Sequence, residues 1–219
     1  MNTLQNIYHL FKKDVTIEWR QKSTIASMFV YVISTVFVIY LSFKGELDAT
    51  VWMAIYWIIL LFVVVNLTIS AFTEEAGRQF YYIRSIASAV ELIGAKMLYN
   101  AIYFVVLSGL TLAILALFFG FPVENGNRFL LVAGLGSIGL ANMFTLLAAI
   151  TARIKNVALI AVLGFPVVIP LILICIRLSG KAMDSFFAVG FVKEIMVLVL
   201  LNVIIIAMSM ILFTYLWRD

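Results

Sequence analysis

The sequence has very few of the residues from which disulfides, metal centres and catalytic sites are built. Its 219 residues include one cysteine, Cys175, and one histidine, His9. A single cysteine excludes an intramolecular disulfide, and without a C-x-x-C-H motif the chain cannot attach c-type haem covalently. A lone histidine supplies neither a convergent set of metal ligands nor a base with its orienting partner. We therefore expect no catalytic residue, no metal and no directly bound cofactor.

Nucleotide-binding motifs are also missing, although two stretches resemble them. The Gly180–Lys181 pair is followed by alanine, and Cys175 stands where a Walker A motif requires its first glycine. Residues 134–139 match G-x-G-x-x-G, but no strand precedes them and they lie inside a long apolar run. The centres of the apolar runs lack charged residues, so the sequence shows no machinery for ion-coupled transport. Any energy that the protein uses must come from a partner.

Long apolar runs are what the sequence has in abundance. Hydrophobic residues make up 65% of the chain and charged residues only 12%, which is far from the composition of a soluble domain. About 20 apolar residues in a helix cross a bilayer core of ~30 Å. The sequence therefore predicts an all-α integral membrane protein with six spanning helices. The runs are Ile25–Phe43, Val51–Phe72, Met97–Gly120, Phe129–Ala152, Val157–Ile176 and Ile195–Leu216.

The segment before the first run has the pattern of an amphipathic helix. Lys12 and Lys13 lie on the polar side of this pattern, away from the apolar positions. We predict that residues 1–24 form a helix in the inner membrane interface with lysines facing lipid phosphate, followed by a six-helix transmembrane domain over residues 25–219. No small-x-small cleavage site follows the first run, so we expect this run to remain as a span. The apolar positions are Leu4, Ile7, Tyr8, Phe11, Val15 and Trp19.

Basic residues are divided unequally between the two sides of such a bundle. If the N-terminus is inside, ten of the 15 Lys and Arg residues lie on the inner side and five on the outer side. This asymmetry predicts a multi-pass protein of the bacterial cytoplasmic (inner) membrane with cytoplasmic N- and C-termini. The net charge of +4 is then a topology signal, and no basic stripe or motif favours nucleic-acid binding.

The inner connection, residues 73–96, is the most informative polar segment. It combines acidic residues with aromatic residues that are too apolar for a free loop. We interpret it as an inner coupling loop that docks on a partner ATPase, and a helix resting in the lipid interface is the alternative reading. The candidate docking residues are Glu74, Glu75, Gly77, Phe80, Tyr81 and Tyr82.

Two features predict the structure of the outer side. The outer half-apolar segment, residues 178–193, is expected to form short helices that dip into the outer leaflet, or a plain loop. Trp52 and Tyr56 stand on one side of a short outer loop and Tyr40 on the other. Because tryptophan and tyrosine favour the membrane interface, these three residues predict an outer aromatic belt.

Small residues and prolines distinguish the fourth and fifth runs. Ala133, Ser137 and Ala141 recur at intervals of four, which predicts a face where helix backbones approach closely. Pro166 and Pro170 each remove a backbone hydrogen bond, which predicts a kinked or locally open helix. The central polar groups are amides whose commoner role is hydrogen bonding between helices. These amides are Asn66, Asn100, Asn142 and Asn202.

Four stretches carry a resemblance to a known family. They are E-W-R-Q-K at Glu18–Lys22, S-T-V-F-V-I-Y-L-S-F at Ser34–Phe43, F-T-E-E at Phe72–Glu75 and G-F-P-V-V-I-P-L at Gly164–Leu171. With the six runs and the preceding helix, the chain resembles the membrane domain of an ABC-2 type exporter, and within that group the CcmB family. It differs from many relatives in having no proline in the inner loop before Lys96.

The resemblance implies a membrane subunit of an ABC-type complex in cytochrome c maturation. Two copies would bind the ATPase CcmA, together with CcmC and CcmD, and ATP hydrolysis would be linked to haem export or to release of the haem-loaded chaperone CcmE. ATP would be bound by the partner, and haem would be handled by the complex. Because His9 is a poor ligand set for haem iron, the sequence favours a non-catalytic transducer. The alternatives are a generic ABC-2 permease for a lipid or other hydrophobic solute, an intramembrane enzyme, and a scaffold without energy coupling.

Overall fold

The computed structural model describes residues 3–20, 22–73, 88–154, 158–183 and 190–218. In these ranges the chain forms seven helices and no strand. Six of the helices are long and apolar enough to span a membrane, which confirms the predicted all-α, six-span architecture. The helices are α1 (Thr3–Arg20), α2 (Lys22–Phe43), α3 (Ala49–Thr73), α5 (Ala89–Phe119), α6 (Gly126–Ile154), α7 (Ala158–Met183) and α8 (Phe191–Arg218).

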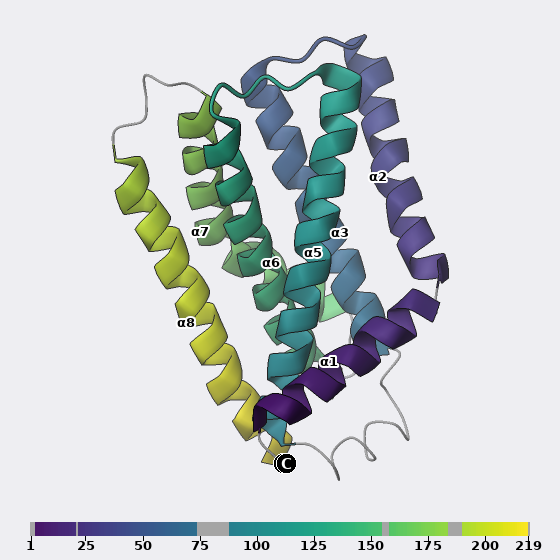
Figure 1. The fold of residues 1–219 in the computed structure, drawn as a ribbon, viewed down its shortest axis with the longest axis vertical. Coiled ribbons are helices and arrows are strands. Elements are labelled where there is room, and N and C mark those ends of the chain that lie inside the picture. The colour runs from purple at the N-terminus through teal and green to yellow at the C-terminus, as the bar shows by residue number, and fades with distance from the viewer. Residues whose placement is uncertain (1–2, 21, 74–87, 155–157, 184–189, 219) are drawn as a thin grey trace.

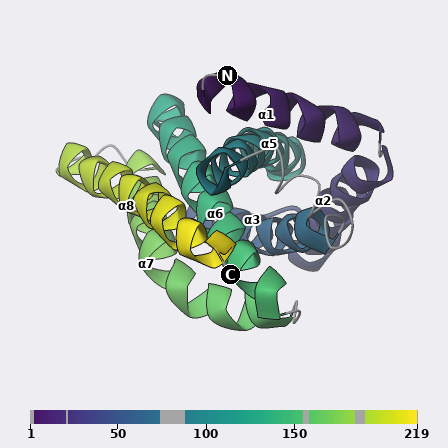
Figure 2. The same ribbon diagram turned by 90° about the horizontal axis from the view of Figure 1, so that it is seen from below.

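The six spans run side by side, and α1 lies obliquely across the lower part of α5 (Figure 1). Both chain termini lie at this end of the bundle, as an even number of spans requires (Figure 2). We call it the α1 end. Helix α6 lies in the middle and packs against α3, α5, α7 and α8, whereas α2 and α8 lie at opposite edges (Figures 1 and 2).

Helix α6 can occupy the centre because small residues let its neighbours approach. Ala133, Ser137 and Ala141 are all buried, with at most 4% of each residue exposed. A Cβ atom at Gly136 would lie 2.5 Å from Trp57 Cη2 and 2.8 Å from Cys175 Sγ. Since real Cβ atoms essentially never come within 3.0 Å of such atoms, α3 and α7 occupy space that a side chain at Gly136 would need.

The inner connection is shorter than the sequence predicts. Helix α3 continues to Thr73, and α5 begins at Ala89 with Ser88 as its N-cap, so residues 88–96 do not belong to a coupling loop. The prediction of a loop over 73–96 is therefore wrong for these residues. The physical reason is that the first turns of α5 are capped and bury apolar side chains, including Leu92 and Ile93. Residues 74–87 lie outside the described part of the chain.

The outer segment is also mostly helical extension. Residues 178–183 are the last turns of α7 and residues 191–193 are the first turn of α8, so the prediction of separate short helices is wrong there. Leu178 and Ala182 are buried within the bundle, which accounts for the half-apolar composition. Lys181 Nζ pairs with Glu194 Oε1 at 2.8 Å and joins the two helices. Residues 184–189 lie outside the described ranges.

The predicted outer aromatic belt is wrong for two of its three members. Trp52 and Tyr56 are completely buried and stack on each other with ring centroids 6.2 Å apart. Both contact the Phe129 ring, at 5.8 and 5.5 Å respectively. The Tyr56 hydroxyl forms a 2.6 Å hydrogen bond with Ser108 Oγ. These rings therefore fill the space where α3, α5 and α6 meet, while Tyr40 is half-buried beside the Phe118 ring.

Candidate coupling site at the α1 end

The first turn of α5 is fixed by a reciprocal capping arrangement. Ser88 has an extended backbone, and its Oγ accepts a hydrogen bond from the Glu91 backbone N–H at 3.3 Å. In return, Glu91 Oε2 accepts a hydrogen bond from the Ser88 backbone N–H at 2.9 Å. This pattern satisfies two N–H groups that would otherwise lack partners at the start of the helix. A rigid helix therefore begins directly after residues 74–87.

The same Glu91 carboxylate also binds α1. Its Oε1 atom accepts a hydrogen bond from Asn6 Nδ2 at 3.1 Å, across 85 positions of sequence. Glu91 is buried, with 7% of its surface exposed, so each of these bonds replaces a lost contact with water. A negative charge in the first turn also interacts favourably with the helix dipole. One buried side chain thus caps α5 and ties it to α1.

Apolar contacts surround this polar link. Ile7 Cδ1 lies 3.7 Å from the position that a Cβ atom would take at Gly94, and the Phe11 and Tyr99 rings are 6.3 Å apart. Leu10 packs against a small core at the same end of the bundle. That core joins α5 to α6 and α8, so the end of the bundle is one packed unit with α1. Its buried members are Ala89, Leu92, Ile93, Met97, Ala149 and Phe213.

Further contacts connect α5 to the rest of the bundle. The Tyr99 ring stacks on the Tyr103 ring at 5.9 Å, and the Tyr103 hydroxyl donates to Met28 Sδ of α2 at 3.8 Å. Asn100 Nδ2 donates to Thr145 Oγ1 of α6 at 2.8 Å. A displacement of α5 would therefore act on polar contacts to both α2 and α6.

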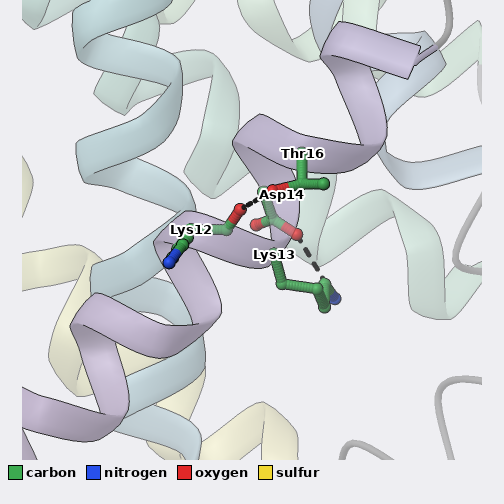
Figure 3. Close-up of polar contacts among 4 residues, drawn as sticks. All are labelled: Lys12, Lys13, Asp14 and Thr16. Atoms are coloured by element: carbon green, nitrogen blue, oxygen red, sulfur yellow. Dashed lines mark hydrogen bonds and ion pairs between the residues drawn. The ribbon is translucent and has the colours of Figure 1, made fainter.

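Several side chains on α1 are exposed. Tyr8 is 61% exposed, and His9 and Lys12 are also exposed. Figure 3 shows Thr16 Oγ1 donating to the Lys12 carbonyl at 2.7 Å and Lys13 Nζ paired with Asp14 Oδ1 at 3.3 Å. The predicted amphipathic helix exists, but residues from its apolar side, Ile7 and Phe11 among them, contact α5.

Among the predicted amides, Asn100 and Asn202 form bonds between helices. Asn100 bonds to α6, and Asn202 Nδ2 of α8 donates to the Leu198 carbonyl of its own helix at 2.9 Å and to the Leu135 carbonyl of α6 at 3.3 Å. Asn66 Nδ2 donates within α3 to the Phe62 carbonyl at 3.0 Å. Asn142 is buried within α6. The central amides thus fasten α6 to α5 and α8 and do not form one polar cavity in the described part of the chain.

The structure distributes the other predicted site residues among three places. The candidate docking residues Glu74, Glu75, Gly77, Phe80, Tyr81 and Tyr82 all lie outside the described residues. Pro166 and Pro170 are inside α7, which is helical throughout the described range, and both are exposed on its surface. Ala133, Ser137 and Ala141 lie in the central helix, away from the capping contacts of α5.

Three residues of the coupling site escape the sequence interpretation. Ser88 and Glu91 have the S-x-x-E spacing of a capping box, so this motif could have located the start of α5. Asn6 carries no comparable signal, because its role depends on how α1 crosses α5.

Comparison with known proteins adds an independent finding. The family model described as CcmB protein matches residues 5–215, nearly the whole chain. No curated protein and no solved structure gave a match. The chain therefore belongs to the CcmB family, whose members are permease-type membrane components of the haem-exporting ABC system for cytochrome c maturation.

Proposed function

We propose that this CcmB family member is a transducer, which receives the conformational stroke of a partner ATPase and passes it across the membrane. The ATPase, CcmA, would dock on the segment of residues 74–87 at the cytoplasmic face of the bacterial inner membrane. Two copies of the chain would act with CcmC and CcmD. Hydrolysis of ATP by CcmA would then drive release of the haem-loaded chaperone CcmE on the opposite side.

The observation that carries this proposal is the way the chain resumes after residues 74–87. The next residue, Ser88, caps a 31-residue helix through Glu91, and that helix is held to α1 by Asn6. At 1.5 Å per residue, a helix of this length extends about 46 Å, enough to cross the membrane. A force applied to the docking segment would therefore act on a stiff rod that contacts α1, α2, α3, α6 and α8.

Transduction is favoured over direct carriage of haem by the position of the only histidine. His9 is exposed on α1, at one end of the bundle. Axial ligands to haem iron are usually histidine, cysteine, methionine or tyrosine side chains in a shaped pocket. The only cysteine, Cys175, is completely buried among packed side chains.

Docking is tested by reversing the charge of the acidic pair. Glu74→Lys together with Glu75→Lys should reduce co-purification of CcmA at least about tenfold, a change that corresponds to about 1.4 kcal/mol of binding free energy. The amount of chain in the membrane should not change. As a matched control, Glu46→Lys with Asp48→Lys makes the same charge change at the opposite end of the bundle and should leave co-purification unchanged. Full recovery of CcmA with the Glu74 and Glu75 variant would refute docking at this site.

A further inference from the structure

We infer that Glu91 is a positioning residue that makes α1 and the start of α5 move as a single lever, an inference that rests on the proposed function. Its two carboxylate oxygens have different partners. Oε2 accepts from the Ser88 backbone, where the proposed docking segment ends, and Oε1 accepts from Asn6 of α1. The carboxylate therefore links the point where force would enter α5 to a second helix.

Separating the two helices would be unfavourable because of where this bond lies. Glu91 is 7% exposed, so without Asn6 one carboxylate oxygen would lose its partner at a site with little access to water. Leaving a buried charged group without its hydrogen bond costs more than forming that bond gains. The directional hydrogen bond adds to the apolar contacts of Ile7 and Phe11 in fixing the register of α1 on α5. A movement of α5 should carry α1 with it.

Helix α2 is the element to which a movement of α1 and α5 would be passed. Helix α1 ends at Arg20 and α2 begins at Lys22, so a displacement of α1 is passed directly to α2. Helix α2 lies at the edge of the bundle, and its main packing partner among the spans is α5. The Tyr103 to Met28 contact provides a second connection between α5 and α2. Force that enters at Ser88 thus reaches α2 by two routes. One is the contact between Tyr103 and Met28, and the other passes through α1 and depends on the bond between Glu91 and Asn6.

A swap of hydrogen-bonding groups tests the role of Glu91. Asn6→Asp places two carboxylates where the 3.1 Å bond now lies, and their repulsion should release α1. Adding Glu91→Gln restores both contacts, because the new amide can donate to the new aspartate while its oxygen accepts from the Ser88 N–H. We expect the Asn6→Asp chain to retain CcmA and its ATP hydrolysis but to lose about tenfold in cytochrome c matured per ATP hydrolysed. The double variant should recover to within about twofold of wild type, because both hydrogen bonds are restored. The tenfold loss in the single variant corresponds to about 1.4 kcal/mol.

The possible outcomes separate this inference from the proposed function. Normal maturation in the Asn6→Asp chain, or a double variant no better than the single one, would overturn the role of Glu91 while leaving docking of the ATPase intact. Failure of the wild-type chain to retain CcmA would overturn the proposed function and this inference with it.

A cross-link provides a second test that does not depend on weakening the contact. Ile7→Cys and Gly94→Cys, in a Cys175→Ala background, introduce two thiols into a contact where Ile7 Cδ1 now lies 3.7 Å from the Gly94 Cβ position. Joining them with a short thiol-reactive reagent should leave maturation within about twofold of the uncross-linked complex, if the helices already move together. Loss of maturation on cross-linking would show that α1 must separate from α5. Tyr8→Cys with Gly94→Cys is the control that should not cross-link, because Tyr8 is 61% exposed.

Discussion

The close approach of three helices at Gly136 leads to a quantitative prediction. A Cβ atom there would meet Trp57 Cη2 at 2.5 Å, Cys175 Sγ at 2.8 Å and Trp57 Cζ3 at 3.0 Å. The indole cannot move away easily, because its Nε1 donates to Ser179 Oγ at 3.1 Å and Tyr56 packs edge-on at 5.2 Å. Gly136→Ala should therefore force α3, α6 and α7 apart or break the Trp57 to Ser179 bond.

The size of the effect follows from comparison with a glycine two positions earlier. Gly134 also lies in α6, but a Cβ atom there meets no atom within 4 Å. Both changes gain the same helix propensity, about 1 kcal/mol in favour of alanine. The difference between the two variants therefore isolates the steric term, which is about 1–3 kcal/mol for an overpacked core. At about 2–4 °C per kcal/mol for a chain of this size, Gly136→Ala should unfold roughly 2–12 °C below Gly134→Ala.

Thermal unfolding in detergent micelles, followed by tryptophan fluorescence, measures this difference. Trp57→Phe should make room beside Gly136, so adding Gly136→Ala to it should cost less than adding it to wild type, as a double-mutant cycle would show. Equal stability of the two alanine variants would refute the steric argument.

Two further predictions concern topology and haem. A reporter fused after Asp219 and one inserted within residues 123–127 should report the cytoplasm and the periplasm respectively, because three spans, α6, α7 and α8, separate the two sites; the same side for both would refute the six-span arrangement. His9→Ala should leave cytochrome c maturation intact and the purified subunit should show no haem absorbance, since His9 is exposed on α1. A stoichiometric haem signal that disappears in the His9→Ala chain would revive direct carriage.

The number and type of the spans were predictable because the hydrophobicity of each segment largely determines them. A helix that crosses the hydrocarbon core must be apolar over most of its length, and such runs stand out in any sequence. The helix ends were less predictable. The charges of Glu91 and Lys96 suggested a polar connection, yet both residues are buried within α5. A hydropathy scale scores a charged residue as solvent-exposed, whereas here the Glu91 carboxylate is buried and takes part in capping the helix.

The orientation of aromatic side chains could not be read from their position along the spans. Trp52 and Tyr56 lie near the end of a helix, where an interfacial role is usual. In a helix that is apolar on all sides, however, the sequence does not show which face meets lipid. Their burial follows from the meeting of α3 with α5 and α6, and from Ser108 on α5, which satisfies the Tyr56 hydroxyl.

The least predictable part of the candidate site is also the part on which transmission of force would depend. The positive-inside count gives Lys12 and Lys96 equal weight, but the structure exposes Lys12 on α1 and buries Lys96 in α5. Sequence patterns report such groups one segment at a time, and the bond between Asn6 and Glu91 joins two segments whose crossing no local pattern encodes. The directional bond adds to the apolar contacts of Ile7 and Phe11 in setting the register of α1 on α5. The exchange of groups between Asn6 and Glu91 therefore tests coupling separately from folding, because the double variant keeps the packing while it reverses donor and acceptor and moves the negative charge to α1.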